Sequence, residues 1–410
     1  MSELTAVVHG ASEVGVVRDG ELETVEDGAV AVEDGAVAAV GPTDEVTADY
    51  PPENAVHAVD ADGGAVLPGF VDGHTHALFA GDRADEFAAK LRGKSYGEIM
   101  SEGGGILRTV RATREAPAER LLANLLDRLD AMLERGTTTV EVKSGYGLDR
   151  ETELRMLDAI ARADDRHPVD VVPTFMGAHA VPEDADADDY VERVVDEQLP
   201  AVADQGIAEF CDVFCEEGAF SVDQSRRVLE AGSERGLVPK VHAEELSRIG
   251  GAQLAADLGA ASADHLLHAT EDDAEALRDA GVTPVLLPAT AFGLGGDYAD
   301  ARAFVDAGAA PAVATDFNPN CYAESMSFDV ALACVEMGLT PAEAVVAATA
   351  TGAESVDREG LGTLQEGTPA DLVVLDAPSH VHVPYSYGVD RVETVLKRGR
   401  PVVRGGDRCA

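Results

Sequence analysis

Eight short apolar runs alternate with helix-forming stretches between residues 69 and 320, and this alternation constrains the fold more than any other feature of the chain. In residues 117–136, leucine and methionine recur with helical period. Strands that alternate with helices form a parallel sheet, and eight of them over about 250 residues match the size of a (β/α)8 barrel. The sequence therefore predicts an α/β protein built on a (β/α)8 TIM-like barrel. The eight predicted strands lie in residues 69–76, 137–147, 170–180, 209–217, 238–245, 262–269, 283–290 and 311–320.

Both ends of the chain have a different pattern. Short valine-rich runs separated by Asp-Gly pairs fill the first 60 residues, and similar runs return near the C-terminus. Asp-Gly between alternating apolar residues is a strong hairpin signal, so we expect antiparallel strands. We expect the two ends to form one small β-sandwich domain. The predicted division is residues 1–62 for its N-terminal part, 63–362 for the barrel and 363–410 for its C-terminal part.

The chain is strongly acidic, with 76 aspartate and glutamate residues against 31 lysine and arginine residues and a formal net charge of −45. Such a surface repels nucleic acid and anionic lipid, so we expect neither as a partner. Because salt screens repulsion between charges, we interpret the acidity as adaptation to high salt, with an ordinary acidic cytosolic protein as the alternative. No apolar run approaches the roughly 18 residues of a membrane span, and we expect a soluble, cytoplasmic protein.

Polar side chains gather at the ends of the predicted barrel strands, where enzymes of this fold carry their active sites. His74 and His76 lie two residues apart in the first strand, so both can offer an imidazole nitrogen to one metal ion. The same spacing recurs in the tail at His380 and His382, without a matching set of partners, and we expect no metal there.

Three further strand ends supply partners for the first pair. His242 ends the fifth run, His265 the sixth and Asp316 the eighth, and in a closed barrel all three can face the first strand. Three neutral imidazoles and a carboxylate suit zinc or iron. The set therefore predicts a metal site, although any one of these histidines taken alone is more simply explained as a core residue.

The barrel and the order His-x-His, His, His, Asp resemble the amidohydrolase superfamily, whose barrels are of the metal-dependent hydrolase type. Members with two metals usually bridge them with a modified lysine or an acid from the fourth strand. Here the fourth run offers Cys211, Asp212, Cys215 and Glu216, and the barrel-strand lysines are Lys143 on the second run and Lys240 on the fifth. The resemblance therefore implies one Zn²⁺ or Fe³⁺ per subunit, and we expect Lys143 to be structural or ion-paired. Glu245, three residues after His242, resembles the catalytic acid of the one-metal members, with a surface glutamate as the alternative.

Five segments carry a closer resemblance: "DGHTHALFAGDRADEFAAKLRGKSYGEI", "EVKSGYGL", "TFMGAHAVP", "KVHAEE" and "ATDFNPN". They are similar to the family that opens the ring of 4-imidazolone-5-propanoate in histidine degradation to give N-formimino-L-glutamate. The resemblance implies that the metal ligands are His74, His76, His242 and Asp316. It implies substrate contacts at Arg83, Tyr96, Tyr146, His179, Glu245 and Asn318, and also at Asn320 and Cys321, where the family usually has a small residue and a hydroxyl residue.

The expected reaction is hydrolysis of a ring C–N bond. We expect a metal-activated water with Asp316 as its proton acceptor, His265 to orient the water and stabilise the oxyanion, and Glu245 to donate a proton to the departing nitrogen. Arg83 is expected to bind the propionate through two hydrogen bonds, with a surface salt bridge as the alternative. Residues 101–110 are expected to form a mobile lid loop near the mouth.

Two other functions stay open at the level of sequence. One is a mononuclear aminohydrolase acting on guanine- or cytosine-like rings, which shares these motifs and would release ammonia. The other is a non-catalytic relative that keeps the barrel as a binding or assembly module. For the imidazolone-ring hydrolase we expect a homodimer.

Overall fold

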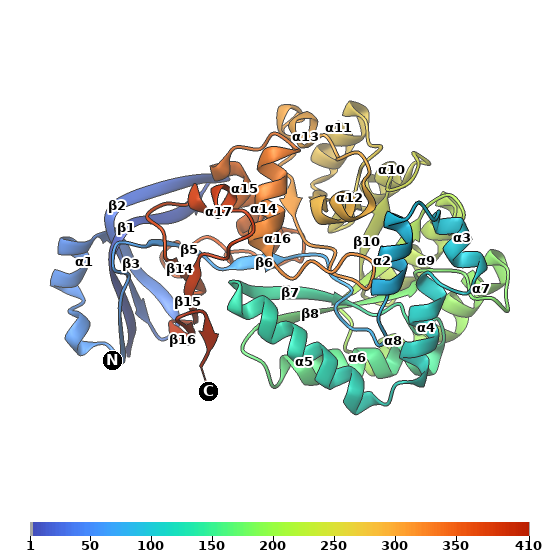
Figure 1. Cartoon of the computed structure of the whole chain (residues 1–410), viewed down its shortest axis with the longest axis horizontal. Helices are drawn as coiled ribbons and strands as arrows, with labels where there is room; N and C mark the ends of the chain where they lie inside the picture. The colour runs from blue at the N-terminus through green and yellow to red at the C-terminus, as the bar shows by residue number, and fades with distance from the viewer. Residues whose placement is uncertain (1–2, 410) are drawn as a thin grey trace.

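The structure is a computed structural model that describes residues 3–409, apart from the side chains of residues 96 and 97. It consists of a barrel of eight parallel strands and, beside it, a mixed sheet drawn from both ends of the chain (Figure 1). The two ends meet where β5 (Ala65–Pro68) pairs antiparallel with β14 (Leu372–Leu375).

Each of the eight predicted runs contains one barrel strand, so the predicted (β/α)8 class is confirmed. Neighbouring strands pair in parallel and in chain order. The barrel closes just beyond its first and last strands, where Thr75 pairs with Phe317 and the Asp316 backbone N–H donates to the His74 carbonyl at 3.0 Å. The strands are β6 (Phe70–Asp72), β7 (Thr137–Lys143), β8 (Asp170–Ala178), β9 (Phe210–Cys215), β10 (Val238–Ala243), β11 (Ser262–His265), β12 (Thr283–Leu286) and β13 (Ala312–Val313).

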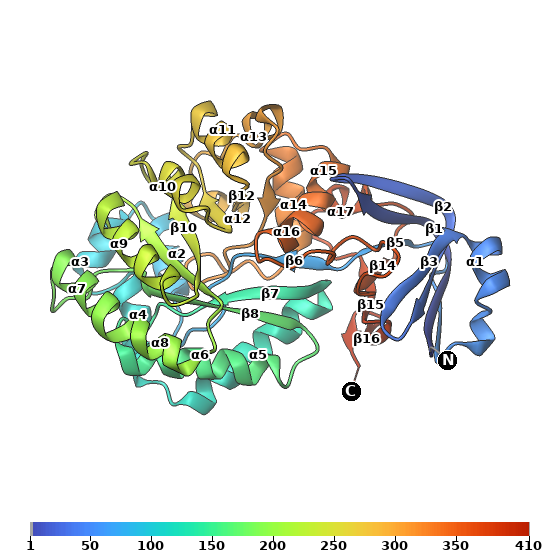
Figure 2. The same cartoon turned by 180° about the vertical axis from the view of Figure 1, so that it is seen from behind.

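Helices surround the barrel, and Figure 2 shows them from behind. The helix predicted from leucine periodicity is α5 (Ala118–Glu134), which buries Leu125, Leu129 and Met132 against the barrel. Within residues 3–409, no helix is both long enough and apolar enough to cross a bilayer. The other helices around the barrel are α2 (Ala84–Leu91), α3 (Tyr96–Ser101), α4 (Ile106–Glu115), α6 (Arg150–Asp164), α7 (Ala187–Arg193), α8 (Leu199–Gln205), α9 (Val222–Ser233), α10 (Gly251–Leu258), α11 (Glu271–Ala280), α12 (Pro288–Leu294), α13 (Ala301–Ala307), α14 (Met326–Val335), α15 (Pro341–Ala347), α16 (Ala350–Glu354) and α17 (His382–Tyr385).

The interior of the barrel holds charged side chains. The Lys143 ammonium lies 2.8 Å from Glu141 Oε1 and 2.7 Å from Asp212 Oδ2, and all three side chains are fully buried. Lys240 lies 3.5 Å from the same Glu141 oxygen. Lys143 is therefore ion-paired, as its place on a barrel strand led us to expect. Because buried charges are costly unless they are paired, this network requires all of its members.

The terminal sheet differs in part from the expected antiparallel arrangement. β1 pairs antiparallel with β2 but parallel with β4 and β5, so the sheet is mixed. Asp19-Gly20 and Asp34-Gly35 form the two expected hairpin turns, whereas Asp27-Gly28 lies inside a strand next to a break in the β1–β2 register. The strands are β1 (Leu4–Arg18), β2 (Glu21–Glu33), β3 (Ala36–Pro42), β4 (His57–Asp60), β5, β14, β15 (Val392–Lys397), β16 (Arg400–Arg404) and β17 (Asp407–Arg408), and α1 (Thr43–Asp49) packs on their N-terminal part.

The domain boundaries expected at residues 62 and 362 stay a prediction. In the structure β5, at residues 65–68, belongs to the terminal sheet, and the first barrel strand begins at Phe70. Some buried valines and leucines of the terminal sheet form a core of their own, whereas others, among them Leu67, Val373 and Val395, join the core of the barrel.

Candidate active site

Three histidines from two strand ends meet in the mouth of the barrel. His74 and His76 follow β6, and His242 lies on β10. One ligand atom from each lies within 4.8 Å of the other two, and all three side chains are buried. The Nε2 atoms of His76 and His242 are 3.2 Å apart. Two ring nitrogens at this separation face a common point, which is the arrangement that a shared cation requires.

Two of these imidazole rings have a carboxylate beside the nitrogen that points away from the common point. His74 Nδ1 lies 2.6 Å from Asp264 Oδ2, and His242 Nδ1 lies 3.0 Å from Asp212 Oδ2. A carboxylate behind a histidine fixes the tautomer and orientation of the ring, as it does behind metal-binding imidazoles. Burial, together with the charge of Lys143, keeps the pKa of His74 well below its usual value, so its ring is neutral and can bind a metal.

Asp316 completes the set. Its Oδ1 lies 3.6 Å from both His74 Nε2 and His76 Nε2, and its Oδ2 accepts a hydrogen bond of 2.6 Å from the Thr290 hydroxyl. The backbone of Asp316 has φ = 48°, and that of His265 has φ = 79°. Such left-handed backbone is uncommon for residues other than glycine and is concentrated at functional sites.

These residues fit a metal ion. The buried Nε2 of His74 has no hydrogen-bond partner among the described residues, yet it points toward the Asp316 carboxylate and the other imidazoles. Three imidazoles and a carboxylate around one point are a donor set that suits zinc or iron. An unpaired buried nitrogen is costly, and a cation at this point would satisfy it.

Two further ionisable groups lie beside the histidines. Glu245 Oε2 is 3.5 Å from His265 Nε2. Burial and the charge of Asp316 raise the pKa of Glu245 to about 8, and burial raises the pKa of Asp316 to about 6. The site therefore holds a carboxyl group that can carry a proton near neutral pH, next to an imidazole that burial keeps neutral.

A cavity of ≈ 620 Å³ opens over this cluster. Its lining contains most of the residues that the sequence indicated as substrate contacts. His179 stacks on His76 with ring centroids 4.6 Å apart, and Tyr146 lies 5.2 Å from His179 by the same measure. The predicted residues in the lining are His76, Arg83, Tyr146, His179, His242, Glu245, His265, Asp316, Asn318 and Asn320.

Arg83 lies at the edge of α2 and has a buried partner. Its Nε donates to Glu86 Oε2 at 2.7 Å, and both side chains are buried. Arg83 therefore forms a salt bridge, whereas the alternative expectation was a salt bridge on the surface. This salt bridge lies in the cavity wall. Residues 101–110, expected as a lid loop, are only partly loop, because α4 begins at Ile106. The Gly105 backbone N–H donates to Glu86 Oε1 at 3.1 Å, so Glu86 links this segment to Arg83.

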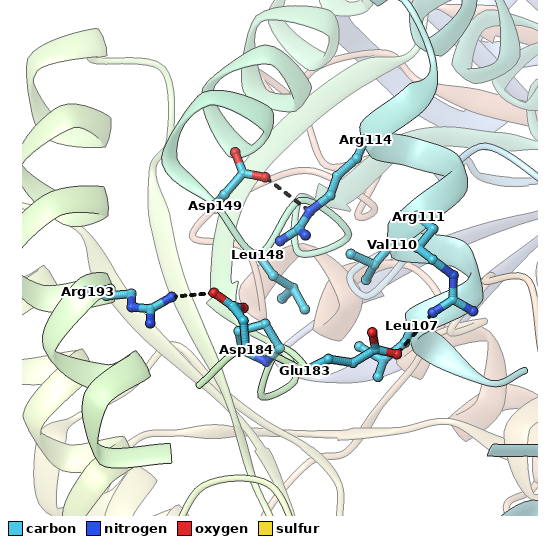
Figure 3. A pocket seen from close by; sticks show the side chains of 10 residues that line it. Leu107, Val110, Arg111, Arg114, Leu148, Asp149, Glu183, Asp184 and Arg193 are labelled. Atoms are coloured by element: carbon cyan, nitrogen blue, oxygen red, sulfur yellow. Dashed lines mark hydrogen bonds and ion pairs between the residues drawn. The ribbon is translucent and has the colours of Figure 1, made fainter. Parts of the chain in front are cut away.

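The loops that carry Tyr146 and His179 are held together from behind by ion pairs around a second cavity of ≈ 360 Å³ (Figure 3). Arg114 Nε lies 3.1 Å from Asp149 Oδ2 and donates to the Gly147 carbonyl at 2.6 Å. Two further pairs, Arg193 with Asp184 at 3.0 Å and Arg111 with Glu183 at 3.2 Å, line the same cavity.

Of the two other predicted contacts, one lies elsewhere and one is not described. Cys321 is not in the cavity lining, and its thiol packs with Ala289 and Leu332 and points toward the Thr315 carbonyl. The side chain of Tyr96 lies outside the described part of the chain. The tail histidines lie far from the cluster in sequence and join no group of metal-binding side chains among residues 3–409; His380 instead contacts Glu13 at 2.8 Å.

Several residues that shape the site did not stand out in the sequence. Lys90 and Lys94 line the cavity, and Asp264 and Thr290 orient predicted ligands. Asp212, noted in the sequence as an acid on the fourth run, lies behind His242. Asp264 precedes His265 at a strand end, and this position is the signal that could have identified it. The lysines lie on and after a helix, where nothing in their spacing sets them apart from surface residues.

The fold and the site together define the chain as a metal-dependent hydrolase of the amidohydrolase class. Its sequence matches the Amidohydrolase family over residues 65–402, and the Imidazolonepropionase-like composite domain of bacteria over residues 28–52. An imidazolonepropionase from Haloarcula marismortui is 72% identical over 98% of this chain and 97% of its own length. One from Geobacillus kaustophilus is 48% identical over 97% and 95%. The chain therefore belongs to the amidohydrolase family and, within it, to the imidazolonepropionases.

Solved structures agree with the fold. A zinc-bound adenosine deaminase from Xanthomonas campestris superimposes with a TM-score of 0.76 over 99% of this chain and 94% of its own length, at 20% identity. A zinc-bound atrazine chlorohydrolase from Arthrobacter aurescens gives a TM-score of 0.69 over 98% and 96%, at 18% identity. At such low identity the likeness shows a shared fold alone, that is, the barrel and the terminal sheet beside it.

Proposed function

We propose that the chain hydrolyses the ring C–N bond of 4-imidazolone-5-propanoate to give N-formimino-L-glutamate, a step of histidine degradation. The observation that carries the proposal is a single cavity with the histidine cluster at its base and cationic side chains in its wall. Near-full-length likeness to proteins named imidazolonepropionase supports the same reaction.

The proposed ligands of the metal are His74, His76, His242 and Asp316. One Zn²⁺ or Fe³⁺ per subunit would supply Lewis-acid chemistry that makes water a nucleophile near neutral pH. Three of the four side chains, His74, His242 and Asp316, are already oriented by the polar contacts behind them, so little rearrangement of these three would accompany metal binding.

Three groups of the chain carry out the proton transfers in this proposal. Asp316 accepts a proton from the attacking water. His265 orients that water and donates to the oxygen that becomes negative as the ring carbonyl is attacked. Glu245 donates a proton to the departing ring nitrogen, for which its position beside His265 at 3.5 Å is suitable.

The remaining lining residues bind the substrate in this proposal. Tyr146 and His179 form an aromatic wall against which a flat ring packs. Asn318 faces the ring, and the two terminal nitrogens of Arg83 face the propionate.

The test of function is direct. Purified protein loaded with metal is incubated in molar salt with freshly prepared 4-imidazolone-5-propanoate, and loss of the ring's ultraviolet absorbance is followed together with appearance of N-formimino-L-glutamate. We expect loss well above the spontaneous rate. Loss no faster than in buffer would contradict the proposal, and release of ammonia from guanine or cytosine would favour an aminohydrolase.

We also propose that the protein is a cytoplasmic homodimer. Exposed apolar side chains such as Phe292, Val335 and Tyr385 on α12, α14 and α17 offer surface for a second copy. Light scattering in molar salt should give twice the chain mass of 42.7 kDa. A single-chain mass across micromolar concentrations would contradict the dimer.

A further inference from the structure

Lys90 faces the active-site cavity and has a neutral partner. It lies at the end of α2, and its ammonium donates to the Asn320 side-chain oxygen at 2.9 Å. Among the side chains that the structure describes, none brings a carboxylate oxygen within 4.0 Å of this ammonium. Asn320 therefore fixes the position of the charge without neutralising it.

Lys90 differs from the other lysines of this chain, because they all have an acidic partner. Acidic residues outnumber basic ones by 76 to 31, so carboxylates are available to pair with lysine. The chain has five lysines, and the other four each form an ion pair: Lys94 with Glu102, Lys143 with Asp212, Lys240 with Glu141 and Lys397 with Asp371. Figure 3 shows the same pairing for three arginines, since Arg111, Arg114 and Arg193 each lie near a carboxylate.

The neighbouring Arg83 does not serve as a free charge, because Glu86 lies 2.7 Å from its Nε and both are buried. The charges of Arg83 and Glu86 nearly cancel, so the pair presents little net charge to the cavity. The net positive charge in this part of the wall is therefore that of Lys90, half-buried between Arg83 and the loop that carries Asn320.

We propose that Lys90, held by Asn320, is the residue that neutralises the carboxylate of the substrate's propionate tail, while Arg83 in its pair with Glu86 provides directional hydrogen bonds. The inference rests on the proposed function for the identity of the tail. It also explains why an asparagine at position 320 is suitable: an acidic residue there would take the charge that the substrate needs. The ligand class is a flat heterocycle with a short anionic tail.

Binding of two matched probes tests the inference without turnover. Calorimetry on the metal-loaded protein in molar salt compares 3-(imidazol-4-yl)propanoate with its uncharged amide, for the native chain and for Lys90→Met, Lys90→Arg and Arg92→Met. Arg92 is the matched control, because it is an exposed cation at the end of the same helix and does not line the cavity. We expect Lys90→Met to weaken binding of the propanoate on the order of 10- to 100-fold and binding of the amide by less than about 3-fold.

Steady-state kinetics provide the second measurement. Lys90→Met should raise KM for 4-imidazolone-5-propanoate with kcat largely retained, Lys90→Arg should recover most of the affinity, and Arg92→Met should leave KM within about 3-fold of native. Equal losses for the propanoate and the amide, or equal losses in Lys90→Met and Arg92→Met, would overturn the inference.

Failure of the inference and failure of the proposed function give different results. A native chain that opens the ring but binds the propanoate and the amide equally well keeps its function and loses the role of Lys90. A native chain that discriminates the two probes through Lys90 but does not open the ring keeps the carboxylate site and loses the proposed reaction.

Discussion

The two nitrogens of His74 have different neighbours, and this difference defines the role of the residue. Nδ1 lies 2.6 Å from the buried Asp264 carboxylate, whereas Nε2 points toward Asp316 with no hydrogen-bond partner among the described residues. Lys143 lies 3.7 Å from the same Asp264 oxygen. The lysine thus helps to keep a carboxylate ionised behind the imidazole, and the imidazole remains available on its other side.

Asp264→Asn tests this arrangement. The amide keeps the volume of the side chain but removes the charge behind His74, so we expect metal affinity to fall on the order of 10- to 100-fold. Competition with a chromogenic chelator measures the affinity, and the exposed Asp272→Asn is the control. Equal metal affinity in Asp264→Asn and the native chain would show that the carboxylate has no part in orienting the ring.

Glu245→Gln separates proton transfer from metal binding. Glutamine has nearly the same shape as Glu245 and can occupy the same position beside His265. It cannot give up the proton that the leaving nitrogen needs. We expect turnover to fall at least about 100-fold with metal content unchanged. Parallel measurement of kcat and of bound metal by elemental analysis checks both points, and a near-native rate would exclude Glu245 as the proton donor.

At the scale of elements, buried carboxylates fix the loops of the barrel mouth. Glu153 on α6 is fully buried and accepts backbone N–H groups from Gly145, Gly147 and Leu148 at 2.9, 2.7 and 2.9 Å. This loop carries Tyr146, and the Gly145 carbonyl lies 3.1 Å from His179 Nδ1. One carboxylate therefore positions both aromatic groups of the cavity wall.

Glu153→Gln should loosen that loop, because an amide presents only one oxygen to the three N–H groups. We expect KM to rise several-fold with metal content retained, and the free energy of unfolding to fall by about 1–3 kcal/mol. Glu151→Gln, an exposed position on the same helix, is the control. A stability loss with KM unchanged would assign Glu153 a structural role only.

The start of α11 gives a pH-dependent prediction. Burial alone would raise the pKa of Asp273, but hydrogen bonds from Arg248, Gln253 and Thr270 outweigh it and lower the pKa to about 2 from the usual 3.8. The ionised form is therefore favoured by folding, so its stabilisation is complete above about pH 4 and is lost as the pH falls toward 2.

We expect Asp273→Asn to lower the free energy of unfolding by about 1–2 kcal/mol at pH 7, and by progressively less below pH 4. Denaturant titrations at several pH values measure the difference, with the exposed Asp272→Asn as the control. A difference between Asp273→Asn and the native chain that grows on acidification would contradict this account.

The whole barrel was predictable because its signals are local. Each strand run and each strand-end histidine is visible in a short stretch, and parallel topology then brings the ends together. The mixed pairing of β1 was not predictable, because packing across the sheet determines that β1 pairs with β4 and β5, and the local sequence does not show it. The partners of His74 and Lys90 were hidden for the same reason, because Asp264 and Asn320 lie 190 and 230 residues away in the chain.

The charge of the whole molecule leads to the last prediction. A formal charge of −45 strains the compact state by self-repulsion, and screening shortens the range of that repulsion from about 10 Å at 0.1 M salt to about 3 Å at 1 M. We therefore expect Tm to fall by on the order of 10 °C when NaCl is lowered from 3 M to 0.1 M. Sucrose at equal osmolality is the control, because it stabilises by exclusion from the surface but does not screen charge. If sucrose restores Tm as fully as salt does, or if Tm does not depend on salt, the acidic surface is not an adaptation to high salt.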